Sequence, residues 1–77
     1  MNKIIIIDDD EELCELVSEY LTVEGFEVSS VNDGESGLAA ALSGEYDMAI
    51  LDVMLPKMNG FDVLRNLRLE SKLPVIM

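Results

Sequence analysis

Short apolar runs alternate along the chain with longer segments in which apolar residues recur every three or four positions. The four isoleucines at 4–7 and the run at 48–51 are continuous apolar segments, a pattern typical of strands covered on both faces in a parallel sheet. Shorter apolar segments around 26–31 and 75–77 resemble strands as well. The pattern therefore predicts four short strands.

The segments between these strands carry helical patterns. Within 11–24, the spacing of apolar residues predicts one buried helical stripe, made of Leu13, Leu16, Val17, Tyr20 and Leu21. Asp10 is the expected N-cap of this helix and Gly25 its stop.

Two further helices are expected after turn signals. The turn Asn32-Asp33-Gly34 can cap a helix over 35–43, and Asn59-Gly60 precedes another at about 61–69. Inward-facing residues predicted for the last helix are Phe61, Leu64 and Leu67.

Strands that alternate with helices through short loops indicate right-handed βαβ units, and hence an open parallel sheet with helices on both faces. Function in such sheets lies at the carboxyl ends of the strands, where the strand order reverses. Asp8 and Asp9 follow the first strand and Asp52 follows the third. We expect these three carboxylates to converge at one edge of the sheet.

Composition narrows the possible functions. The 77 residues carry five lysines and arginines against sixteen aspartates and glutamates, a net charge of -11, and no histidine. These values exclude histidine-dependent dyads and histidine metal ligands, and they disfavour binding to nucleic acid or to an anionic membrane. The 49% hydrophobic content favours a folded domain over a disordered chain.

The single Cys14 cannot form an intramolecular disulfide, which favours a reducing cytoplasmic location. The sequence shows no signal-peptide pattern, and no apolar run approaches the roughly 20 residues needed to cross a bilayer.

Three carboxylates held together repel one another unless they share a proton or bind a cation. Oxygen ligands without nearby cysteine or histidine favour a hard cation, Mg²⁺ or Mn²⁺, which can bridge to a phosphoryl oxygen. A carboxylate beside such a metal can act as a nucleophile toward phosphorus. The alternative is that these aspartates are helix caps and solvated loop ends, which is the favoured interpretation for Asp10.

Five segments together resemble the receiver domain of two-component response regulators, of the OmpR/PhoB type and its CpxR-like members: 3–10 (KIIIIDDD), 31–34 (VNDG), 50–56 (ILDVMLP), 59–61 (NGF) and 73–77 (LPVIM). The resemblance implies a three-layer flavodoxin/CheY-like fold, here truncated to βαβαβαβ with sheet order 2-1-3-4.

The resemblance also implies the role of each site residue. Asp52 would be the phosphoacceptor for a sensor histidine kinase, in a phosphorelay protein that is not itself an enzyme. Mg²⁺ would be bound directly by Asp9, by Asp52 and by the backbone carbonyl of Met54, and through a water by Asp8. Gly60 would permit the backbone to turn into the third helix.

The resemblance implies that residues 1–77 are the first two-thirds of a receiver, and that the fifth strand, the last two helices and an output domain are missing. The Ser/Thr and the lysine that bind the phosphoryl group in the family lie beyond this stretch, so we expect an impaired switch. We also expect one face of the first and third strands to be uncovered, and self-association as a dimer.

Other interpretations are weaker. A haloacid-dehalogenase-like site would need a Thr or Val where Glu12 stands, an EF-hand would need Gly in place of Leu13, and no dinucleotide-binding glycine motif follows the first strand. The serious alternative is an inactive fragment or engineered half-fold that acts as a self-assembling unit without phosphotransfer.

Overall fold

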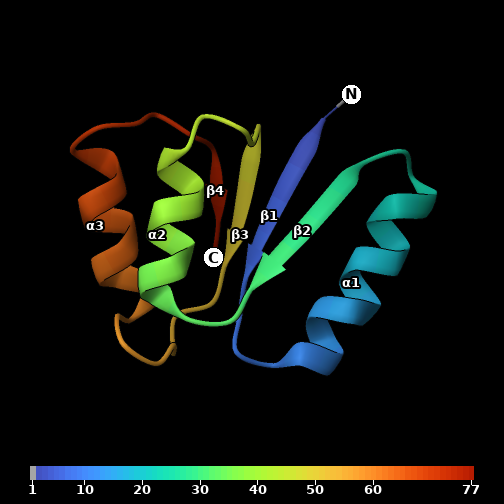
Figure 1. Cartoon of the computed structure of the whole chain (residues 1–77), viewed down its shortest axis with the longest axis horizontal. Coiled ribbons are helices and arrows are strands. Elements are labelled where there is room, and N and C mark those ends of the chain that lie inside the picture. The colour runs from blue at the N-terminus through green and yellow to red at the C-terminus, as the bar shows by residue number, and fades with distance from the viewer. Residues whose placement is uncertain (1) are drawn as a thin grey trace.

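In the computed structural model, which describes residues 2–77, four parallel strands form one sheet with helices on both sides (Figure 1). Met1, part of the expected 1–77 domain, lies outside the described residues. The elements in chain order are β1 (Lys3–Ile7), α1 (Glu11–Val23), β2 (Glu27–Val31), α2 (Gly34–Leu42), β3 (Met48–Leu51), α3 (Gly60–Arg68) and β4 (Val75–Ile76).

The strand order is β2-β1-β3-β4, which confirms the predicted 2-1-3-4 topology. β1 pairs with β2 on one side and with β3 on the other, so that Ile5 lies between Ser29 and Ala49. Because all the strands are parallel, their carboxyl ends lie at the same edge of the sheet, where the chain leaves for α1, α2 and α3 (Figure 1).

The isoleucines of β1 divide the core into two parts. Ile5 and Ile7 pack with the buried residues of β3 and α3, while Ile4 and Ile6 pack with Cys14 of α1. All four are at most 3% exposed, as the continuous apolar run predicted. The expectation of an uncovered face is therefore wrong for the first strand, because both of its faces are closed. On the third strand it is partly right, because Met48 and Ile50 on one face are only half-buried.

The buried stripe predicted for α1 is only partly right. Cys14 is buried, and the half-buried Val17 and Leu21 pack beside it. The other three predicted members are exposed to different degrees, with 44% for Leu13, 64% for Leu16 and 69% for Tyr20. The apolar pattern of α1 is thus wider than the strip of helix that touches the sheet.

The inward face predicted for α3 is confirmed at Leu67 and, as a half-buried residue against the core, at Leu64, but is wrong at Phe61. Val63 and Leu67 are buried, whereas Phe61 is 58% exposed. The helix begins at Gly60 with Asn59 as its N-cap, and its inward residues follow the four-residue spacing from Val63 to Leu67. Phe61 consequently lies beside the core-facing stripe instead of within it.

Each helix begins at the carboxyl edge of the sheet with a side-chain N-cap. Asp10, Asp33 and Asn59 are the three N-caps, and each side chain accepts the backbone N–H of the residue three positions later, at 3.1, 2.7 and 3.0 Å. These caps fix where the chain leaves the edge and enters each helix.

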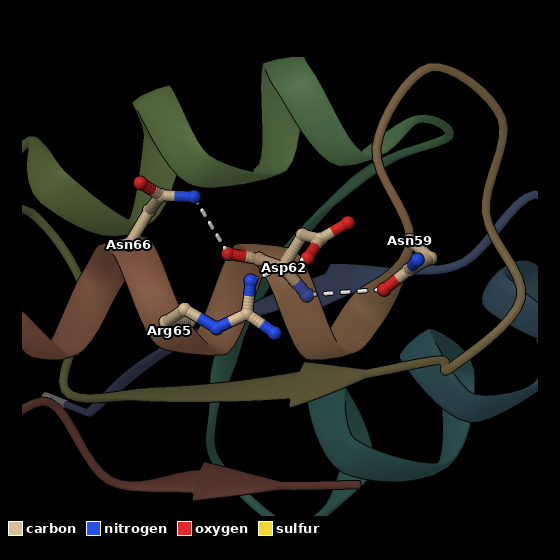
Figure 2. A network of polar contacts seen from close by, with 4 residues as sticks. All are labelled: Asn59, Asp62, Arg65 and Asn66. Atoms are coloured by element: carbon tan, nitrogen blue, oxygen red, sulfur yellow. Dashed lines mark hydrogen bonds and ion pairs between the residues drawn. The ribbon is translucent and has the colours of Figure 1, made fainter.

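In α3 the cap continues into a small polar network (Figure 2). The Asp62 carboxylate accepts from Arg65 at 2.9 Å, and the Asp62 carbonyl accepts from the side-chain amide of Asn66 at 2.9 Å.

Within residues 2–77, none of the helices has both the length and the apolar character that a membrane span requires.

Candidate metal centre

Asp8, Asp9 and Asp52 come together at the carboxyl edge of the sheet. One carboxylate oxygen from each lies within 4.8 Å of the others. The convergence follows from the pairing of β1 with β3, since the Asp52 N–H continues the ladder by donating to the Ile7 carbonyl at 2.9 Å. Asp8 and Asp52 are half-buried and Asp9 is exposed, so the cluster opens to solvent.

The backbone of Asp8 is held from several directions. Its N–H donates to the Val31 carbonyl at 3.1 Å, and its side chain accepts the Asp10 N–H at 3.0 Å. Its carbonyl accepts two further hydrogen bonds, from the Asn32 side-chain amide at 2.9 Å and from the Cys14 thiol at 3.4 Å. The turn from β1 into α1 is therefore fixed at the residue where the cluster begins.

On the β3 side, the start of α3 lies directly against the phosphoacceptor candidate. The Gly60 N–H donates to the Val53 carbonyl at 2.7 Å. A Cβ on Gly60 would collide with the Asp52 carbonyl oxygen and would lie 2.8 Å from the Val53 Cα. Only glycine fits this close approach, which explains the residue at the start of α3.

Met54 lies two residues beyond Asp52 in the loop between β3 and α3. Its side chain is 80% exposed. Together with Asp9 it lines a surface depression whose other members are Val53, Leu55, Asn59 and Phe61. Met54 therefore lies at the same edge of the sheet as Asp9.

The donor set fits a hard cation. Within residues 2–77 the two ion pairs, Lys3 with Glu27 and Arg65 with Asp62, lie outside the cluster, so no side-chain cation neutralises it. Three carboxylate oxygens at this spacing, open to water on one side, match the preference of Mg²⁺ for oxygen ligands and retained waters.

Two titratable groups near the edge are shifted. Hydrogen bonding from the Ser36 backbone N–H is the main cause that lowers the pKa of Asp33, and Lys57 adds a smaller electrostatic contribution. Burial raises the pKa of the Cys14 thiol, and the nearby carboxylates, Asp8 first, add to that shift. The thiol therefore stays protonated at neutral pH and can donate to the Asp8 carbonyl.

The sequence predicts that the three carboxylates meet, but it does not predict the contact of Asn32 with Asp8. From the sequence alone, Asn32 is expected only in a turn that precedes a helix. The available signal was its position directly after β2, at the same edge as the carboxylates.

Comparison with known proteins finds a matching family. The model of the response regulator receiver domain matches residues 4–77. The transcriptional regulatory protein CpxR of Klebsiella pneumoniae is 51% identical over 77 residues, which are 100% of this chain and 33% of that protein. The chain spans about a third of the length of the curated relatives it matches.

Solved structures match in fold and in sequence. The response regulator TrrA in complex with the histidine kinase ThkA superposes with a TM-score of 0.88 and 34% identity, over 97% of this chain and 66% of that one. TrrA from Thermotoga maritima in complex with Mg(2+)-BeF gives a TM-score of 0.87 and 36% identity, over 94% of this chain and 63% of that one.

Proposed function

The chain belongs to the response regulator receiver family, and from this premise we propose that Asp52 accepts a phosphoryl group from a sensor histidine kinase at a Mg²⁺ site. The observation that carries the proposal is the convergence of three carboxylates from β1 and β3 within 4.8 Å. Receiver domains of this family act as phosphoacceptors and not as enzymes.

The proposal gives each residue of the cluster a role. Asp9 and Asp52 bind Mg²⁺ directly, Asp8 binds it through a water, and the backbone carbonyl of Met54 completes the protein ligands. Bound Mg²⁺ would neutralise the negative charge that accumulates when a phosphoryl group approaches three carboxylates. The hydrogen bonds on the Asp8 backbone support this assignment, because they hold the β1 half of the site in place.

In the transfer step, a carboxylate oxygen of Asp52 attacks the phosphorus of a phosphohistidine. The new O–P bond forms as the P–N bond breaks, and the electron pair of that bond stays on the imidazole nitrogen. The product is an acyl phosphate on Asp52. Asp52 is half-buried, so part of the residue remains accessible to solvent.

A sensor histidine kinase is the proposed partner in the whole protein. The structure of TrrA with the kinase ThkA supports this, because TrrA shares the fold and 34% of the sequence. Residues 1–77 are proposed to be the first part of a receiver that works in the cytoplasm. The net charge of -11 argues against direct contact of these residues with nucleic acid.

We also propose that the 77-residue chain associates as a homodimer. Exposed apolar side chains support this, namely Leu16, Tyr20 and Val23 on α1 and Ile76 on the edge strand β4. Static light scattering of a dilution series is expected to give the mass of a dimer at high concentration. A monomer at every concentration would refute the association without touching the phosphoacceptor proposal.

Titration with Mg²⁺ followed by beryllium fluoride, which mimics a phosphoryl group on a carboxylate, tests the site. Amide resonances of residues 8–10 and 52–54 should shift with Mg²⁺, and a bound ¹⁹F signal should appear only when Mg²⁺ is present. Asp52→Asn should abolish the bound signal. Asp47→Asn should leave the bound signal unchanged, because it removes the same charge from an exposed aspartate at the other end of the sheet, where the Asp47 carboxylate accepts the Lys3 N–H at 2.7 Å.

An absent ¹⁹F signal together with a well-defined oligomer would instead favour the alternative function, a self-assembling unit without phosphotransfer.

A further inference from the structure

Two chain segments supply the acidic site, and a third segment touches both of them. This third segment is the turn between β2 and α2, residues 32–34, which we call the β2–α2 turn. None of its side chains belongs to the carboxylate cluster. Its contacts nevertheless reach the residues on either side of that cluster.

Asn32 holds the β1 half of the site. Its side-chain amide donates to the Asp8 carbonyl at 2.9 Å, and the Cys14 thiol donates to the same oxygen at 3.4 Å. That oxygen belongs to the planar peptide that joins Asp8 to Asp9, so holding it fixes the orientation of the peptide plane. The directions in which both carboxylates leave the backbone depend on this plane.

Gly34 holds the β3 half. Its N–H donates to the Pro56 carbonyl at 3.1 Å, and a Cβ at this position would collide with the Met58 carbonyl oxygen. The loop that follows Asp52 therefore lies directly against the start of α2. Asp33 anchors the turn itself, because its carboxylate accepts the Ser36 N–H at 2.7 Å.

We propose that the β2–α2 turn sets the relative position of the two halves of the acidic site, and that Asn32 is a positioning residue for the carboxylates of Asp8 and Asp9. The inference rests on the proposed function, since it assigns Asn32 a role toward the same Mg²⁺. Groups that orient metal ligands in this way commonly influence metal affinity. Asn32 is exposed, so water competes for its hydrogen bond and the effect is modest.

Asn66 provides a matched control. Its side-chain amide also donates to a backbone carbonyl at 2.9 Å, that of Asp62, but within α3 and outside the cluster (Figure 2). Asn32→Ala and Asn66→Ala therefore remove the same kind of hydrogen bond. A purely structural role of Asn32 predicts that the two variants differ from the unmodified chain only in stability.

The experiment is an NMR titration of the 77-residue chain with MgCl₂. For Asn32→Ala we expect a dissociation constant raised roughly three- to fivefold, and for Asn66→Ala no change. Before any metal is added, the carbonyl carbon resonance of Asp8 should shift in Asn32→Ala and stay in place in Asn66→Ala. If Asn32→Ala does not fold, Asn32→Ser is measured in the same way, since its hydroxyl ends one bond short of the lost amide nitrogen.

The outcomes separate the two proposals. If the unmodified chain binds Mg²⁺ and the Asn32 variant binds it equally tightly, the inference about Asn32 is overturned and the proposed function is not. The absence of any saturable Mg²⁺ response in the unmodified chain would overturn the metal site of the proposed function, and the inference with it.

Discussion

On each face of the sheet the core contains two isoleucines of β1, yet the two faces differ in the side chains that pack against these isoleucines. On one face, Ile5 and Ile7 pack with Ala49, Leu51 and Val63, all at most 2% exposed. On the other, Ile4 and Ile6 have one buried neighbour from a helix, Cys14, and otherwise contact half-buried side chains.

The first of these faces is covered by α2 and α3 (Figure 1), and both helices contact the chain at or just after Asp52. The starts of both helices lie against the loop after Asp52, through the close approaches of Gly34 to Met58 and of Gly60 to Asp52. The α1 face reaches the site through Cys14 and the Asp10 cap. Perturbing the α2/α3 face should therefore disturb the β3 side of the site more than perturbing the α1 face.

The largest expected difference between the faces concerns stability. Ile5→Ala should cost near the upper end, and Ile4→Ala near the lower end, of the range of about 2–5 kcal/mol measured for such truncations. Both side chains are at most 1% exposed, but the β3 neighbour of Ile4 is the half-buried Met48, which can move into the space, whereas that of Ile5 is the buried Ala49. Urea unfolding of the two variants measures the difference. Equal costs would show that the two faces are packed alike.

Gly34→Ala and Gly37→Ala separate a contact with the site loop from a contact with the core. Both glycines lie in α2, and a Cβ would meet the Met58 carbonyl in the first case and the Ile7 side chain in the second. Each variant should lose about 1–3 kcal/mol of stability through overpacking. Only Gly34→Ala should shift the amide resonances of residues 53–59 strongly, and similar spectra from both variants would contradict the proposed contact.

Mg²⁺ should stabilise the fold by binding to the acidic site at the carboxyl edge of the sheet, which contacts the helices of both faces. At about ten times the dissociation constant, binding should raise the free energy of unfolding by about 1.4 kcal/mol, and a chelator should reverse the gain. Thermal unfolding with and without Mg²⁺ measures it. Asp52→Asn should lose most of the gain and Asp47→Asn should keep it. A gain of equal size in Asp52→Asn would place the binding elsewhere.

The smallest expected effect is a pH dependence of the α2 cap. A carboxylate with a lowered pKa contributes stability that is fully present above its ordinary value and is lost as the pH falls through the lowered one. Asp33 should therefore account for part of the stability lost below about pH 4. Asp33→Asn keeps a capping oxygen but does not titrate, so its acid unfolding curve should be flatter. Superimposable curves would argue against the Ser36 contact as the cause.

How far the sequence predicts the structure depends on how local each signal is. The isoleucine run predicts a doubly covered strand because every position is apolar, and strand-terminal carboxylates predict the site because parallel strands end at one edge. The rotation of α1 was not predictable. Leu16 and Tyr20 fit the apolar stripe of the sequence as well as Val17 and Leu21 do, and which of them the sheet covers depends on how the helix is turned against it. The Asn32 contact depends in the same way on the tertiary arrangement.

The central claim is that carboxylates from two adjacent strands form a Mg²⁺-dependent phosphoacceptor at Asp52. The most direct measurement is the intact mass of the chain after exposure to acetyl phosphate, with and without Mg²⁺, followed by mapping of the modified residue. We expect the gain of one phosphoryl group only when Mg²⁺ is present, located on Asp52 and absent from Asp52→Asn. No gain in mass, or a gain that persists without Mg²⁺ or in Asp52→Asn, would contradict the claim.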